Sequence, residues 1–197
     1  KQADKVRKSI GIVFQDPSSD EILTGYENLK LHGWLYDMPS DLREERIKEV
    51  LELVELTDRR NDRVKKYSGG MRRRLELARG LMHHPKILFL DEPTLGLDPQ
   101  SREHIWKYIE NLAKEKNMTI VLTTHYMDEA DKLCDRLAII DKGKIAVLGS
   151  PIQLKKNLGG DIIRLKAKTL DIDVLKNLPY VKNISPCDGE VCLTLED

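Results

Sequence analysis

Short apolar runs occur at wide intervals along this chain, and mostly polar or charged residues separate them. Three runs lie at residues 9–14, 86–91 and 119–124, next to polar or turn-forming residues. Apolar runs of this length are typical of short buried strands. Two further runs, at 137–140 and 145–148, flank a turn that contains Gly143, so they predict a β-hairpin.

Between these runs, apolar residues recur at helical spacing. The positions that follow Asp41 predict one helix inside a helical region over residues 22–60, and further helices are predicted over 68–84, 99–116 and 127–134. Strands that alternate with helices imply an α/β fold with a mostly parallel sheet. In such folds the ligand chemistry lies at the carboxyl ends of the strands.

The pattern changes after Pro151. Strands are predicted over 162–168, 181–185 and 191–195, with a helix over 173–178. We therefore expect two domains, a larger one over residues 1–150 and a small α+β domain over 151–197. Because no closing element follows the last strand, we expect this second domain to be cut short.

Composition narrows the classes of function. Of the 197 residues, 40% are apolar and 34% charged, which fits a globular protein with a heavily charged surface. Lys and Arg total 33, Asp and Glu total 33, and the formal charge is +0. Nucleic-acid binders usually carry a basic excess, so we expect no nucleic-acid partner. No apolar run approaches the roughly 20 residues that span a bilayer, so any membrane role needs a partner chain.

Two acids follow the second apolar run. Asp91 and Glu92 sit where that strand is predicted to end, and carboxylates there are costly unless they bind a cation or a polarised water. Phosphoryl transfer uses this arrangement, with one acid holding Mg²⁺ and another group orienting the attacking water. The structural alternative is that both acids cap a loop.

A serine and two glycines open the helix predicted from residue 68. Gly69 and Gly70 allow a ligand to approach the backbone closely, and free N–H groups at a helix start favour phosphate. The alternative is that Ser68 is only a helix N-cap. We interpret the arginines at 72–74 as a solvated face.

These segments form an ordered set. The set comprises Gln15, Ser68-Gly69-Gly70-Met71, Leu90-Asp91-Glu92-Pro93-Thr94, Gly96-Leu97-Asp98-Pro99 and Thr123-Thr124-His125. In this order and spacing it resembles the motifs of ATP-binding cassette (ABC) ATPases, over residues 1 to about 150. The resemblance implies a P-loop NTPase-like core with a helical subdomain over about 16–84, and ATP and Mg²⁺ as cofactors.

The resemblance also implies roles at the strand ends. Gln15 resembles the glutamine that touches Mg²⁺ or the attacking water, and Asp91 the acid associated with Mg²⁺. Glu92 resembles the catalytic base, and His125 the switch histidine that contacts the γ-phosphate.

Two further motifs imply a dimer. Ser68, Gly69 and Gly70 resemble the signature loop, which binds the γ-phosphate of ATP held by the opposite subunit. Asp98 resembles the aspartate at the dimer seam, and its place before Pro99 also makes it a good helix N-cap.

One family motif is missing. The sequence contains no G-x-x-x-x-G-K-[ST] phosphate-binding loop. We expect that the chain begins partway through the ATPase domain, and that by itself it binds MgATP poorly and hydrolyses it hardly at all.

The segments over residues 14–17 and 23–29 resemble drug-resistance exporter subunits, in which the ATPase is a separate chain. The resemblance implies a subunit that powers an exporter as a homodimer, bound to an integral-membrane subunit on the cytoplasmic face of the cell membrane. The alternatives are an ABC ATPase that acts as a mechanical switch on protein or nucleic acid, and a non-catalytic interaction module.

Overall fold

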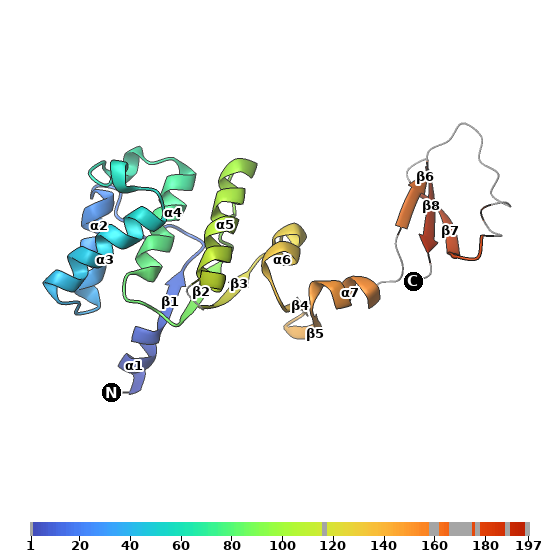
Figure 1. Cartoon of the computed structure of the whole chain (residues 1–197), viewed down its shortest axis with the longest axis horizontal. Coiled ribbons are helices and arrows are strands. Elements are labelled where there is room, and N and C mark those ends of the chain that lie inside the picture. Colours follow the sequence, from blue (N-terminus) through green and yellow to red (C-terminus); the bar gives the residue numbers. More distant parts are fainter. Residues whose placement is uncertain are drawn as a thin grey trace. The chain divides into compact units, whose positions relative to one another are not determined.

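The computed structural model describes residues 2–115, 118–157, 162–165, 175, 178–187 and 190–195. It divides into two compact units, residues 1–133 and 134–197. The elements of the first unit (Figure 1) are, in order, α1 (Gln2–Ser9), β1 (Ile10–Val13), α2 (Gly25–Leu35), α3 (Ser40–Leu53), the 3₁₀ turns η1 (Thr57–Arg59) and η2 (Val64–Lys66), α4 (Gly69–Leu81), β2 (Ile87–Asp91), α5 (Pro99–Glu115), β3 (Thr119–Thr123) and α6 (Met127–Leu133).

The three strands of the first unit form a parallel sheet in the order β1-β2-β3. Val13 pairs with Leu90, and Asp91 pairs with Thr123. All three strands therefore end at one edge of the sheet, as the alternation of strands and helices predicts. The α/β class and the parallel sheet are confirmed.

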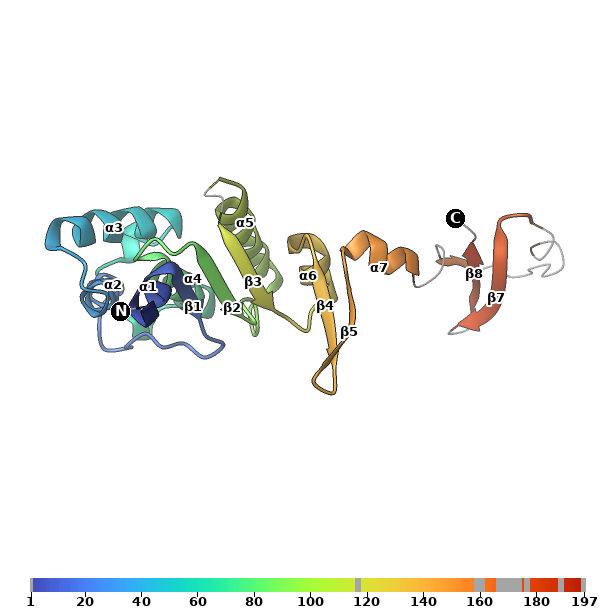
Figure 2. The same ribbon diagram turned by 90° about the horizontal axis from the view of Figure 1, so that it is seen from below.

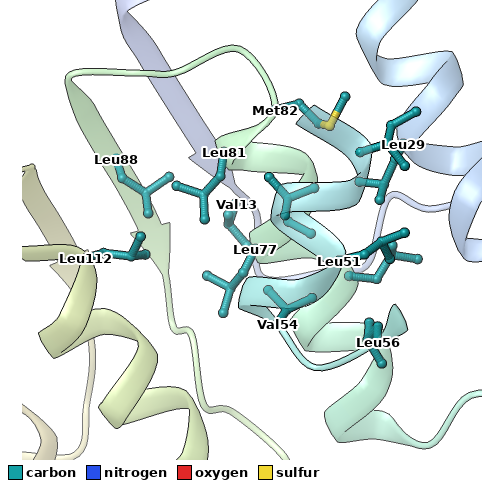
Figure 3. Packing of buried hydrophobic residues seen from close by; sticks show 14 of the residues in the cluster. Val13, Leu29, Leu51, Val54, Leu56, Leu77, Leu81, Met82, Leu88 and Leu112 are labelled. Atoms are coloured by element: carbon teal, nitrogen blue, oxygen red, sulfur yellow. The ribbon is translucent and has the colours of Figure 1, made fainter. Parts of the chain in front are cut away.

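The helices of this unit share one apolar core with the sheet. In Figure 3, Leu77 and Leu81 of α4 lie close to Val13 of β1 and Leu88 of β2. Leu51 of α3 belongs to the same cluster and is 2% exposed. Helix α4 thus packs against the sheet and against the other helices at once. In both Figure 1 and Figure 2, α5 runs beside β3.

Local hydrogen bonds fix where the helices begin. Thr24 and Glu27 form a reciprocal capping box at the start of α2. Ser68 caps α4 by accepting a hydrogen bond from Met71 N, so Ser68 is a helix N-cap, and its binding role stays a prediction. The polar residues before β1 form α1, which we did not predict, and Ser9 belongs to that helix rather than to the strand.

The second unit begins with an antiparallel hairpin of β4 (Leu137–Asp141) and β5 (Lys144–Gly149). Lys142 and Gly143 in its turn have φ angles of 47° and 75°, which suit a tight hairpin turn. The predicted hairpin is confirmed. An unpredicted helix, α7 (Pro151–Asn157), follows, capped by Ser150 and Gln153.

The remaining strands of this unit are β6 (Ile162–Leu165), β7 (Val181–Cys187) and β8 (Glu190–Leu195), an antiparallel sheet in the order β6-β8-β7. The helix predicted over 173–178 lies outside the described residues, apart from positions 175 and 178. The domain boundary at residue 150 stays a prediction, since the hairpin falls in the second compact unit. Within the described part of the chain, no helix combines the length and the apolar composition needed to cross a bilayer.

Candidate functional site

Two neighbouring strand ends hold the first candidate carboxylate. Asp91 ends β2, Thr123 ends β3, and the two residues pair in parallel register. Thr123 Oγ1 donates a hydrogen bond to Asp91 Oδ1. The Asp91 side chain is exposed at this edge of the sheet. A carboxylate held in this way is suited to bind a cation or a water molecule at that edge.

Glu92 follows in a strained backbone conformation. Its φ is 43°, in the left-handed region that residues with a side chain rarely adopt. Two contacts hold it there: Glu92 N lies 3.1 Å from Thr123 O and 3.2 Å from Thr123 Oγ1. Strain of this kind costs on the order of 1–3 kcal/mol and concentrates at functional sites. Four other non-glycine residues also have a positive φ, so the contacts of Glu92, rather than its φ angle, set it apart.

His125 lies directly opposite Glu92. Its Nδ1 atom is 3.2 Å from Glu92 Oε1, and the two side chains are 53% and 26% exposed. The His125 ring also packs against Tyr126, with ring centroids 4.1 Å apart. The predicted base and the predicted switch histidine thus meet at the sheet edge, where both are accessible to a ligand.

Arg73 of α4 joins Gln15 to these acids. Its guanidinium donates to Gln15 O at 3.4 Å, to Asp91 O at 2.8 Å and to Glu92 O at 3.1 Å. It also donates to Phe14 O at 2.5 Å and to Pro93 O at 2.7 Å. The main chain at Gln15 and at both acids therefore surrounds a single guanidinium, while the side chain of Gln15 is exposed.

The solvated-face interpretation of the three arginines is wrong for Arg73, which is 7% exposed. Burial lowers its pKa, and the charges of Glu76, Asp91 and Glu129 oppose that shift. An arginine remains charged even so. The sequence contained a signal for this burial, because Arg73 shares a helix face with Leu77 and Leu81, at steps of four residues.

Glu129 of α6 is a second residue that the sequence reasoning missed. It is fully buried and accepts hydrogen bonds from Thr94 Oγ1 and Trp106 Nε1, both at 2.8 Å. It thereby ties the segment that follows Glu92 to helix α5. The sequence gave only a weak indication that Glu129 is buried. The residue lies four positions after His125, on an amphipathic stretch.

The Ser68–Gly70 turn lies at the start of α4, and Ser68 and Gly69 are exposed. A Cβ added to Gly70 would lie 2.9 Å from Ser101 Oγ, so α4 approaches α5 closely there. The turn borders a cavity of about 290 Å³. Among the described residues, no hydrogen bond or ion pair joins it to Asp91, Glu92 or His125. The described hydrogen bonds thus link four predicted residues, directly or through Arg73, and this turn is not part of that set.

Asp98 directly precedes α5. Its Oδ1 atom accepts a hydrogen bond from Ser101 N at 3.0 Å, so its predicted N-cap role is confirmed. Hydrogen bonds from the Ser101 side chain and backbone hold the pKa of Asp98 below its usual value. Asp98 is exposed, which leaves it accessible to a second molecule.

The donor set at the sheet edge fits Mg²⁺ that arrives with a nucleotide. The described residues contain no group of three or more His, Cys, Asp or Glu that could hold a metal ion by themselves. Mg²⁺ usually takes one or two protein carboxylates and fills its other positions with phosphate oxygens and water. Asp91 supplies such a carboxylate, and the exposed side chain of Gln15 carries an amide oxygen of the same ligand class.

Comparison with known proteins identifies similar chains. A family model described as "ABC transporter" matches residues 1–95. The linearmycin resistance ATP-binding protein LnrL of Bacillus subtilis (strain 168) is 40% identical over 189 residues, which cover 94% of this chain and 60% of that protein. The daunorubicin/doxorubicin resistance ATP-binding protein DrrA of Streptomyces peucetius is 44% identical over 165 residues, which cover 84% of this chain and 50% of that protein.

A Nod factor export ATP-binding protein of Cupriavidus pinatubonensis is 39% identical over 171 residues, covering 86% of this chain and 52% of that protein. The chain thus spans about half to three fifths of the length of these relatives. Among solved structures, cbiO1 of Clostridium perfringens, part of an ABC transporter complex, has a TM-score of 0.71 and 30% identity over 78% of this chain and 62% of that one. A dimeric cassette, MJ0796 with ADP and Pi, has a TM-score of 0.66 and 29% identity, over 75% of this chain and 65% of that one.

Proposed function

We propose that this chain is an exporter-type ATP-binding subunit of the ABC transporter family, and that the protein hydrolyses ATP to power a membrane exporter. One observation carries the proposal: the strained residue Glu92 faces His125 beside the carboxylate of Asp91. These are the groups that hydrolysis of a nucleoside triphosphate requires at one place.

Each residue at the sheet edge has a distinct role in the proposal. Asp91 holds Mg²⁺ together with the side chain of Gln15, and the bound ion supplies positive charge against the phosphates. Glu92 accepts a proton from the attacking water, since its carboxylate is accessible and fixed by the contacts to Thr123. His125 contacts Glu92 through Nδ1, and in the proposal its ring also contacts the γ-phosphate.

The remaining predicted residues act on a second nucleotide. Ser68, Gly69 and Gly70 close over ATP held by a second copy of the subunit, and their backbone N–H groups and the helix dipole favour the γ-phosphate. Asp98 lies at the seam between the copies. The exposure of Ser68, Gly69 and Asp98 supports this arrangement, as does the likeness to a cassette whose structure is dimeric.

The proposed partner is an integral-membrane exporter subunit, with the ATPase at the cytoplasmic face of the cell membrane. The relatives named for drug resistance and for Nod factor export support an exporter. We test this point by co-purification. Recovery with an integral-membrane protein supports the proposal, whereas recovery with ribosomes or DNA contradicts it and favours a mechanical switch.

The ATPase itself is tested by comparing two polypeptides. One is the 197-residue chain, and the other, called here the full-length subunit, adds an upstream segment with the phosphate-binding loop. We expect MgATP turnover from the full-length subunit and little from the shorter chain, because the loop supplies the lysine and backbone cradle for the phosphates. Absence of turnover in the full-length subunit would contradict the proposal, and equal turnover by both polypeptides would contradict the expected need for the loop.

A further inference from the structure

Helix α4 holds the segment after β1 with two side chains that lie one helical turn apart. Arg73 contacts the beginning of that segment at Phe14 and Gln15. Glu76 contacts its later part at Ser18 and Ser19. The segment has no helix or strand of its own between Phe14 and Leu23, so side chains of α4 supply much of its support.

Glu76 is a buried acid that accepts hydrogen bonds from this segment and from Arg79 of its own helix. It is 4% exposed, and Oε1 accepts hydrogen bonds from Ser18 N at 3.2 Å and from Ser19 N at 2.8 Å. Oε2 accepts from Ser18 Oγ at 3.0 Å and from Arg79 Nη1 at 2.9 Å. A buried carboxylate is costly unless such bonds replace its hydration, which makes the contact specific.

Arg73, one helical turn before Glu76, binds the backbone of two separate segments. Its planar guanidinium carries five N–H donors in a fixed fork, and here it donates to five backbone carbonyl oxygens. Two belong to the segment after β1, and three belong to the residues Asp91, Glu92 and Pro93. A lysine offers a single ammonium group and is unable to span this set.

We propose that Arg73 and Glu76 are positioning residues that form a clamp, fixing residues 14–19 and the backbone of Asp91 and Glu92 to the helix that begins at the Ser68–Gly70 turn. Packed rigid elements transmit small displacements through direct contacts. Movement of α4, when the turn engages a second subunit, therefore moves Gln15 and Glu92 into place together. This role rests on the proposed function.

The test uses the full-length subunit with Arg73→Lys, Glu76→Ala and a matched control, Arg46→Lys. Arg46 is also buried, at 5% exposure, and its guanidinium donates to Leu81 O at 2.6 Å and Met82 O at 3.2 Å, at the far end of α4. Arg46 belongs to α3, so its substitution removes a buried guanidinium that contacts the end of α4 without touching the clamp. Thermal unfolding identifies any general loss of stability.

Turnover provides the first readout. We expect Arg73→Lys to lower kcat about ten- to a hundredfold, because small misplacement of catalytic groups has effects of this size. KM for MgATP should change less than about threefold, since Arg73 touches backbone and not substrate. Arg46→Lys should keep kcat within about twofold of the unsubstituted subunit. Equal losses of kcat in both variants would overturn the proposal.

Amide hydrogen exchange provides a readout that does not depend on hydrolysis. We expect Glu76→Ala to speed exchange at the amides of Ser18 and Ser19 about tenfold or more, because both lose their acceptor. Arg46→Lys should leave both amides unchanged. Unchanged exchange in Glu76→Ala would overturn the clamp, even if the full-length subunit hydrolyses ATP. The exchange data could instead show an intact clamp while the full-length subunit hydrolyses no ATP. That result would contradict the proposed function, and with it the positioning role.

Discussion

The Nδ1 atom of His125 lies 3.2 Å from the Oε1 atom of Glu92, across the ends of two neighbouring parallel strands. Thirty-three positions separate the two residues along the chain. The contact exists because β2 and β3 pair in parallel and end together, so that whatever follows each strand is brought to the same edge. It links the proposed base to the group that orients it.

Substitution of that base gives the first prediction. In the full-length subunit, Glu92→Gln should lower kcat by about 10²–10⁴-fold, because the amide accepts no proton from water. The variant should accumulate as a nucleotide-bound dimer, measured by size-exclusion chromatography with ATP and Mg²⁺. The control is Glu103→Gln, an exposed residue of α5. Normal steady-state hydrolysis by Glu92→Gln would refute its assignment as base.

A second prediction concerns the histidine of the pair. His125→Ala should reduce kcat about a hundredfold while nucleotide affinity falls less, because the ring acts on the reacting phosphate and on Glu92. Single-turnover kinetics and equilibrium binding separate the two effects. His84→Asn is the control, since His84 is exposed and has a φ of 53°, a conformation that asparagine tolerates. Similar turnover in both variants would argue against a role for His125.

The buried acid of α6 gives a third prediction, for stability. Glu129→Ala should lower the free energy of unfolding by about 2–3 kcal/mol, because the hydroxyl of Thr94 and the indole N–H of Trp106 lose their buried acceptor. Urea unfolding of the full-length subunit measures the change. Glu103→Ala, at an exposed position of α5, should stay within about 0.5 kcal/mol. Equal effects would mean that Glu129 adds nothing beyond a surface residue.

The fourth prediction is a pH dependence that arises from His32. The pKa of His32 is lowered from 6.5 to about 4, mainly by burial. The charges of Arg79 and His83 contribute to this shift, and the charge of Glu76 opposes it. Between these values the unfolded chain binds a proton that the folded chain does not. Stability should therefore fall as pH drops from 6.5 to about 4 and level off below that.

The size of this effect is on the order of 3 kcal/mol, from the shift in pKa at about 1.4 kcal/mol per unit. Urea unfolding at a series of pH values measures it, and His32→Leu should make the profile flatter over this range. The pKa of His83 is also lowered, mainly by burial, so part of the slope should persist in the variant. An unchanged slope would show that His32 is not the source.

Much of the fold could be read from the sequence because its elements are locally encoded. The apolar runs predicted β2 and β3 to within a residue or two, and Asp98 and Ser68 marked the starts of α5 and α4 through their capping side chains. Helices α1 and α7 were missed because, at eight and seven residues, they are too short for an apolar repeat to mark them. Polar helices of this kind are set by capping and by contacts with neighbouring elements.

The sequence by itself determined which chemical groups are available and in which order they occur, through the motifs at Gln15, Ser68–Gly70, Asp91–Glu92 and His125. Only the tertiary structure decided which of them meet, and that Arg73 and Glu76 are buried at the centre rather than solvated. The reason is physical: spacing along the chain fixes a side chain's helix face or strand end. Its burial and its partners depend on segments that are distant in sequence and pack against it.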